Sequence, residues 1–354
     1  MEFGLSEEQI LLQDSVNRYL DEASSLDQVR ELCKNPGADV WAGLVDIGVP
    51  GILVSEANGG LGMSALDAAI VAEALGSHTA HAPFIGSAVM APVALEAAGT
   101  NPGDVLGAMM AGEKRVGIAV GEAIAARRDA GIQSQGASLT GKALYVLDHG
   151  ADAYLVADQN KALFLVERSD HGLSDQSLAT IDETRRTGEL ILDGATGIKI
   201  SDDPAVLQKS LDAGRVMLAA DTLGAAQNML DQAVAYAKER EQFNRPIGSF
   251  QAVKHMCAEM AAELEPCRAL VWFAAHALDE LPAEATVSAC HTKAHLAEVG
   301  KFVAKTATEV HGGMGFTDLL GLHYWFKRIG FNRQLLGAPE LVREEAARVQ
   351  GLIG

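Results

Sequence analysis

The sequence predicts an α+β protein in which helices come first, a small β domain follows and a helical bundle ends the chain. Three observations predict this order. Apolar residues recur at helical spacing up to about residue 112, five short apolar runs between turn residues follow, and helical spacing returns from Pro204. We therefore divide the chain into an N-terminal helical domain at 1–112, a middle β domain at 113–203 and a C-terminal helical bundle at 204–354.

Composition limits the classes of function. The chain has 354 residues, of which 48% are apolar, and this is enough for a sizeable core in two or three domains. By length alone, one large mixed domain is the alternative to two or three. The net charge of -19 argues against binding to nucleic acid, whose phosphates require clustered lysine and arginine. The same charge argues against docking on an anionic membrane.

Targeting signals are not found in the sequence. Residues 1–16 lack the basic and apolar parts of a secretory signal, and no apolar run reaches the length of about 18 residues that a membrane span needs. The four cysteines, at positions 33, 257, 267 and 290, form no C-x-x-C pair. We therefore expect a cytoplasmic protein with reduced thiols.

The first helix is predicted to begin after Ser6, because Ser6 can cap it and Gln9, three residues later, completes a capping box. A glycine-rich stretch at 56–62 interrupts the helical pattern, which resumes at 64–76. In the middle domain, glycine, aspartate and asparagine clusters separate the apolar runs, as in strands joined by turns. We expect strands at 115–120, 144–147, 153–157, 162–166 and 189–192.

The bundle opens with a helix predicted over about 205–240. Its buried face is indicated by residues at alternating steps of four and three, namely Leu207, Leu211, Gly214, Leu218, Asp221 and Ala225. Asp221 is the single carboxylate in this stripe, and burying it unpaired costs free energy. It therefore either pairs with a cation or faces a functional cavity.

Two further segments could hold a ligand. The run 240–251 ends a helix in a turn that presents an arginine and an aromatic ring, which suits a diphosphate and a planar ring, although a plain basic helix end is the alternative. The glycines of the run 309–316 let a ligand approach the backbone. This run is neither a Rossmann fingerprint nor a P-loop, the histidines lack the spacing of a metal site, and no G-x-S-x-G elbow occurs. We therefore expect no metal and no hydrolase of that type.

Taken together, these segments resemble the acyl-CoA dehydrogenase family, in order and at the family's spacing. The N-terminal half supplies LSEEQ at 5–9, the glycine-rich 56–62 and IVAEALG at 70–76. The C-terminal half supplies LGAA at 223–226, the run 236–243, PIGSFQAVKH at 246–255 and HGGMGF at 311–316. The resemblance covers nearly the whole chain, and the string of 240–251 is highly specific for the family.

The resemblance implies a middle β-barrel or β-sandwich, a C-terminal four-helix bundle, and dimers or tetramers with FAD at a subunit interface. At the flavin ring, the matching stretches are 119–123 and 145–148. The family has glutamine where this chain has Glu309, and a carboxylate there repels the diphosphate. The positions that match FAD contacts are Arg240, Phe243, Ile247 and Gln251 on the side of the neighbouring subunit, and Glu309, Gly312 and Gly313 at the other end of FAD.

The family reaction removes the Cα proton of an acyl-CoA with a carboxylate while the Cβ hydride passes to FAD. Leu336 occupies the position of the usual base, and Gly214 that of the glutamate which some members use instead. Asp221 lies two turns beyond Gly214 on the same face, displaced by roughly 10 Å, and is one candidate base. Glu340 is the second candidate, although it also suits a helix N-terminus.

Three functions remain open. The chain is an active dehydrogenase that uses Asp221 or an unrecognised base, or the base-lacking subunit of a heterotetramer, or a protein that binds acyl-CoA or FAD without dehydrogenation. It resembles short members of the family that degrade steroids, in which one subunit lacks the glutamate. The residues at Gly214 and Leu336 also suggest room for a polycyclic acyl group. By the same resemblance, an electron-transfer flavoprotein accepts the electrons in lipid or steroid catabolism.

Overall fold

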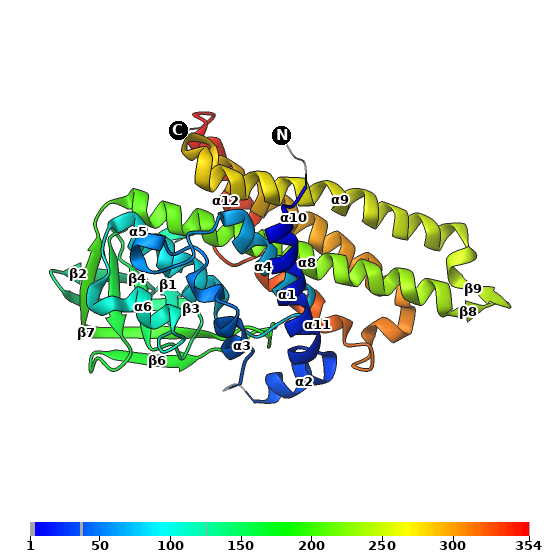
Figure 1. The fold of residues 1–354 in the computed structure, drawn as a ribbon, viewed down its shortest axis with the longest axis horizontal. Helices are drawn as coiled ribbons and strands as arrows, with labels where there is room; N and C mark the ends of the chain where they lie inside the picture. Colours follow the sequence, from blue (N-terminus) through cyan, green and yellow to red (C-terminus); the bar gives the residue numbers. More distant parts are fainter. Residues whose placement is uncertain (1–3, 36–37, 126, 354) are drawn as a thin grey trace.

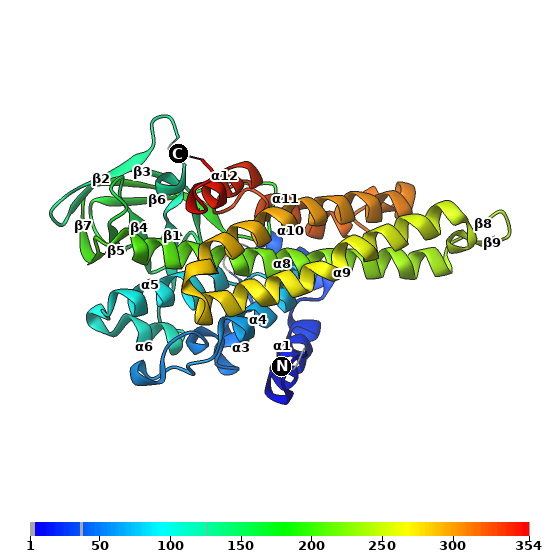
Figure 2. The ribbon, with the colours of Figure 1, turned by 90° about the horizontal axis from the view of Figure 1, so that it is seen from above.

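The computed structural model of the protein describes residues 4–35, 38–125 and 127–353, so the first three residues of the segment searched for a signal lie outside the described residues. Helices, a β-rich region and helices again follow one another along the chain, as predicted (Figure 1). The β-rich region lies at one end of the molecule. The long helices α8 (Pro204–Glu239), α9 (Gln251–Glu280) and α10 (Pro282–His311) run side by side away from it (Figures 1 and 2).

The first helix, α1 (Glu7–Ala23), begins as predicted. The backbone N–H of Gln9 donates to the Ser6 hydroxyl at 3.2 Å, and the Ser6 backbone N–H donates to the Gln9 side chain at 3.0 Å. This confirms the capping box. The other N-terminal helices are α2 (Leu26–Lys34), α3 (Trp41–Asp46), α4 (Ala65–Ser77), α5 (Ala91–Ala98) and α6 (Val105–Met110), with the short 3₁₀ turns Val49–Gly51, Glu56–Asn58 and Pro102–Asp104 and a π-helix, η3, at Ile85–Met90.

The strands of the middle region form one seven-stranded sheet in the order β2-β3-β1-β4-β5-β7-β6. Because β3 also pairs with β7, five of these strands close on themselves, which confirms the barrel expectation. Buried side chains such as Tyr154 and Phe164 fill the interior. The elements are β1 (Val116–Ala119), α7 (Gly121–Ile124), β2 (Gly131–Gln135), β3 (Ser138–Leu147), β4 (Ala153–Ala157), β5 (Leu163–Glu167), β6 (Leu173–Ser177) and β7 (Thr187–Ser201).

Helix α8 is the centre of the bundle, and all six residues of its predicted stripe are buried. It packs against α4, α9, α10 and α11. The remaining C-terminal elements are the hairpin strands β8 (Glu241–Gln242) and β9 (Arg245–Pro246), the 3₁₀ turns η5 (Ile247–Ser249) and η6 (Gly312–Phe316), and the helices α11 (Leu322–Asn332) and α12 (Pro339–Val349).

Helices α4 and α8 cross with their backbones in contact. A Cβ atom added at Gly76 would collide with the Asp221 carbonyl, and one added at Gly224 would collide with the Glu73 carbonyl. Neither obstacle is a flexible side-chain end that can move aside. The crossing therefore depends on glycine in both helices.

We expect Gly76→Ala to destabilise the protein by about 1–3 kcal/mol or more, because overpacking against a fixed backbone costs this much. Alanine otherwise stabilises a helix relative to glycine by roughly 0.5–1 kcal/mol. Gly330→Ala in α11 is the matched control, since its Cβ would meet only Ile181 at 3.8 Å. Urea unfolding of both variants checks this prediction, and an equal stability of the two would contradict it.

The four cysteines are free thiols, as expected from their spacing. Across the part of the chain that the structure describes, no helix combines the length and apolar character needed to cross a bilayer.

Candidate functional site

A cleft of about 430 Å³ lies between the barrel and the loop that joins α11 to α12. Figure 2 shows α12 beside the β-rich region. The cleft brings together the two stretches matched to the flavin ring and Leu336, the position matched to the usual base. Its lining residues are Ile118, Val120, Gly121, Ile124, Ala125, Arg127, Leu144, Tyr145, Leu147, Phe331, Gln334, Leu335, Leu336, Gly337, Ala338 and Leu341.

Among the described residues that line this cleft, none is an aspartate or a glutamate. Glu122 is the chain neighbour of the lining residue Gly121, but its carboxylate accepts hydrogen bonds from Arg127 at 2.9 Å and from the Leu144 backbone N–H at 3.0 Å. The lining is therefore mostly apolar, and Arg127, the single cation among its described residues, is already paired with Glu122.

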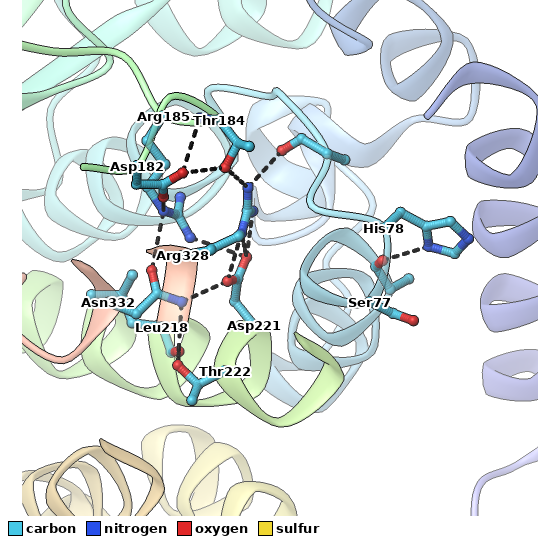
Figure 3. A network of polar contacts seen from close by, with 12 residues as sticks. Ser77, His78, Asp182, Thr184, Arg185, Leu218, Asp221, Thr222, Arg328 and Asn332 are labelled. Atoms are coloured by element: carbon cyan, nitrogen blue, oxygen red, sulfur yellow. Dashed lines mark hydrogen bonds and ion pairs between the residues drawn. The ribbon is translucent and has the colours of Figure 1, made fainter. Parts of the chain in front are cut away.

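Asp221 lies in a buried polar network away from the cleft lining (Figure 3). Arg328 donates from Nε to Oδ1 at 2.9 Å and from Nη2 to Oδ2 at 2.6 Å, and Asn332 donates to Oδ1 at 2.6 Å. Arg185, from the segment before β7, forms an ion pair with Oδ2 at 3.0 Å. Of the two alternatives that the sequence left open for Asp221, this geometry favours pairing with a cation.

The protonation of Asp221 agrees with this pairing. Burial by itself raises the pKa of the carboxyl group, but Arg328, Arg185 and the hydrogen bond from Asn332 outweigh burial and lower the pKa to about 2. Such a carboxylate is a weak proton acceptor near neutral pH.

Glu340, the second candidate base, lies in the first turn of α12 with an exposed side chain. Arg333 contacts it at 3.4 Å. Hydrogen bonding to its own backbone N–H and the neighbouring arginines lower the pKa of Glu340. It lies outside the cleft lining, at the helix N-terminus that the sequence offered as its alternative role.

The space beside Gly214 is filled, so the expectation of room for a polycyclic acyl group at this point is wrong. A Cβ atom added at Gly214 would lie 2.6 Å from Leu336 Cδ1 and 2.7 Å from Met90 Sδ. Met90 ends the π-helix η3, and both side chains are buried. The sequence did not indicate this contact because Met90 is far from Gly214 along the chain.

The residues matched to FAD contacts lie at the C-terminal end of α8 and just after it, away from Gly214. Arg240 and Gln251 are exposed, Ile247 is half-buried, and the Phe243 side chain is 88% exposed. Phe243 also has a left-handed backbone, with φ of 53°. The hairpin β8–β9 lies at the far end of the long helices (Figure 1). The exposed Arg240 and Phe243 give this tip a cationic and aromatic surface.

The second matched segment reaches the same end of the bundle. The rings of Tyr236, in the last turns of α8, and His311 lie 4.6 Å apart, which places Gly312 and Gly313 near the hairpin. Both glycines are exposed, and a Cβ built on either would have no described atom within 4 Å apart from the adjoining backbone. Glu309 is exposed, with Lys305 at 3.6 Å.

These residues fit FAD as half of a site. The hairpin offers a guanidinium group for a diphosphate and an exposed aromatic face, and Gly312 and Gly313 leave the backbone open to a ligand. The 26 residues of helix between Gly214 and Arg240 correspond to about 39 Å. The tip and the cleft of one chain are therefore too far apart to hold one cofactor together.

The sequence analysis did not single out a group of charged side chains, mostly buried, beneath the cleft. Arg215 pairs with Glu345 at 2.7 Å and with Asp212 at 3.4 Å. With Cys290, these two carboxylates have the proximity of a metal site, but the guanidinium already supplies the cation. Lys293 is buried nearby on α10.

The sequence did contain a signal for Lys293. It lies at the buried-face spacing of α10, four residues after Ala289, three before Leu296 and seven before Gly300. The same reasoning that singled out Asp221 applies to this lysine.

A second cleft, of about 260 Å³, shares Ile124 with the first. It lies between α7, the start of α8 and α12, and it is lined by the cationic residues Lys161, Arg215 and Arg348 as well as by Glu345. This cleft could accept an anionic group.

Comparisons with known proteins cover nearly the whole chain. A family model described as "Acyl-CoA dehydrogenase, C-terminal domain" matches residues 205–351, and one described as "Acyl-CoA dehydrogenase, N-terminal domain" matches residues 6–102. The protein "Acyl-CoA dehydrogenase IpdE2" of Mycobacterium tuberculosis is 30% identical over 340 residues, which are 95% of this chain and 95% of that protein.

Two solved structures share the fold at 27% identity each. One is a variant of the Tcur3481-Tcur3483 steroid ACAD, with a TM-score of 0.89 over 98% of both chains. The other is the ChsE4-ChsE5 complex from Mycobacterium tuberculosis, with a TM-score of 0.87 over 100% of both chains.

Proposed function

Because this chain belongs to the acyl-CoA dehydrogenase family, we propose that it is the base-lacking subunit of a heteromeric enzyme that dehydrogenates an acyl-CoA between Cα and Cβ. Enzymes of this family depend on FAD. When bound, FAD supplies the acceptor for the Cβ hydride.

One observation carries the proposal: in the part of the chain that the structure describes, no carboxylate lines the cleft. The family reaction needs a carboxylate next to the substrate Cα. Asp221 is held by two guanidinium groups and Glu340 is exposed on α12, so neither is available at the cleft. We therefore assign proton removal to a glutamate of the partner subunit.

In this proposal, the hairpin of this chain completes the FAD site of the partner. The Arg240 guanidinium neutralises the diphosphate, Phe243 covers an apolar ring, and Ile247 and Gln251 extend this surface. Gly312 and Gly313 leave room for the cofactor against the backbone. Glu309 opposes the diphosphate charge, and Lys305 offsets part of that repulsion.

The proposal also extends to the substrate and to the electron acceptor. Lys161 at the second cleft suits a phosphate of coenzyme A, and Arg348, which pairs with Glu344 at 2.6 Å, adds positive charge beside it. The similarity to a steroid ACAD supports a steroid-derived acyl group. An electron-transfer flavoprotein would reoxidise the flavin, as the family resemblance implies.

The test is co-expression of this chain with a family member that carries the usual glutamate. We expect the two to copurify with FAD, and the flavin spectrum to bleach anaerobically with a ring-bearing acyl-CoA from a panel of linear and steroid-like thioesters. The chain purified alone, with the same panel, is the control.

Two other outcomes would contradict the proposal. Bleaching by the chain alone would mean a self-sufficient dehydrogenase with an unrecognised base. A complex that holds FAD but bleaches with no member of the panel would mean a protein that binds the cofactor without dehydrogenation.

A further inference from the structure

Lys293 is a buried cation without a carboxylate partner. Its side chain lies on α10 at 2% exposure, and none of the ion pairs formed among the described residues includes it. Its Nζ instead donates to the backbone carbonyls of Arg333 at 3.2 Å and Gly337 at 3.3 Å. Since buried lysines are almost always paired with an acid, this arrangement requires an explanation.

The carbonyl next to that of Gly337 is also bound by a buried cation. Arg215, on α8, donates from Nε to the Leu336 carbonyl at 3.0 Å while its other nitrogens bind Glu345. Two cations from different helices therefore hold consecutive carbonyls of one turn. Hydrogen bonds from charged donors are stronger than those between neutral groups.

The turn that they hold has an unfavourable backbone. Leu336 has φ of 53° and Gly337 has φ of 109°. A left-handed conformation is costly for leucine, so it persists only where the surroundings fix it. Leu335, Leu336, Gly337 and Ala338 all line the main cleft.

Lys293 also connects this turn to α11. Arg333 is the C-cap of that helix, whose last carbonyls lack partners within the helix. An ammonium group at a helix C-terminus is favoured by the helix dipole. The lysine thus ties the end of α11 to the wall of the cleft.

We propose that Lys293 and Arg215 are positioning residues that fix the Leu336–Gly337 turn and so shape the wall of the cleft against which the flavin or acyl ligand lies. The fixed turn is inferred from this chain alone, whereas the identity of the ligand rests on the proposed function.

The charged groups around Lys293 make its contribution to fixing the turn sensitive to pH. Burial lowers the pKa of Lys293 to about 7, with Arg215 on α8 and Arg333 after α11 adding to the effect and Cys290 opposing it. Glu345 of α12 reaches this group through Arg215. Because the unfolded chain binds the lysine proton more tightly, the free energy of unfolding rises as pH increases from about 7 towards 10, and below pH 7 this contribution stays constant at its lowest value.

The test compares Lys293→Met with Lys301→Met, which removes an exposed lysine of the same helix. Hydrogen exchange of the amides of residues 334–338 is measured by mass spectrometry in the chain as it purifies. We expect at least tenfold faster exchange in Lys293→Met at pH 7 and no change in Lys301→Met. In addition, the free energy of unfolding of wild type minus that of Lys293→Met should increase as pH rises from 7 to 10.

Lys293→Gln keeps a donor and should restore part of the protection, and it replaces Lys293→Met if that variant does not fold. Unchanged exchange in a folded Lys293 variant, or a stability difference that does not vary with pH, would overturn the proposal. FAD binding to the complex is measured separately. Faster exchange with an unchanged FAD affinity would support the fixed turn. It would argue against the flavin as the ligand that lies against this wall of the cleft.

Discussion

Replacing Asp221 with alanine is expected to lower the free energy of unfolding by about 3–5 kcal/mol, because it leaves a buried charge uncompensated. Arg328 would lose its ion-pair partner, and Arg185 would keep only the more distant Asp182 at 3.8 Å. Asn332 would lose one of its two acceptors and keep the Thr222 hydroxyl. The network joins the segment before β7 to α8 and α11, so several parts of the molecule would loosen together (Figure 3). Urea unfolding followed by tryptophan fluorescence measures the effect.

Asp231→Ala on the exposed side of the same helix is the control, and its effect should stay within about 0.5 kcal/mol. Because the folded pKa of Asp221 is lowered to about 2, its contribution is complete above the ordinary carboxyl pKa and is lost as pH falls towards 2. A fully stable Asp221→Ala that has lost dehydrogenation in the complex would instead revive Asp221 as the base.

The second large effect is expected at the hairpin. In the complex, Arg240→Ala combined with Phe243→Ala should weaken FAD binding by about 100-fold or more, since a charged hydrogen bond contributes roughly 1.5–3 kcal/mol and stacking on an aromatic ring roughly 1–3 kcal/mol. The fold should be unaffected because both side chains are exposed. Flavin fluorescence on equilibrium dialysis measures the loss.

Lys238→Ala, in the last turn of α8, removes a nearby exposed cation and should leave FAD affinity unchanged. If the double variant keeps its flavin and its circular dichroism matches that of wild type, the hairpin is not part of the FAD site.

Local patterns predicted much of the fold. The capping box at Ser6 and the stripe of α8 depend on residues within a few turns of each other, and the structure confirms both. The strands β2 and β6 escaped prediction because their sequences, GIQSQ and LSDQS, are polar edge strands without an apolar run. The pattern of alternation is weak here because β2 has one buried residue and β6 has none.

The site was predictable only where it could be matched to a family pattern. Burial of Asp221 followed from spacing, but its partners Arg185 and Arg328 lie in other elements and could not be identified from the stripe. The same limit applies to Met90, which fills the space at Gly214 from a π-helix that has no clear sequence signal. Long-range packing, not local propensity, decides these contacts.

The length of about 39 Å along α8, from Gly214 beside the cleft residue Leu336 to Arg240 at the hairpin, has a thermodynamic consequence if FAD bridges two subunits. Cofactor binding and subunit association then become linked equilibria governed by mass action. Diluting the enzyme would release flavin, and excess free FAD would hold the assembly together. The fraction of chains that carry flavin would thus report the degree of assembly at each protein concentration.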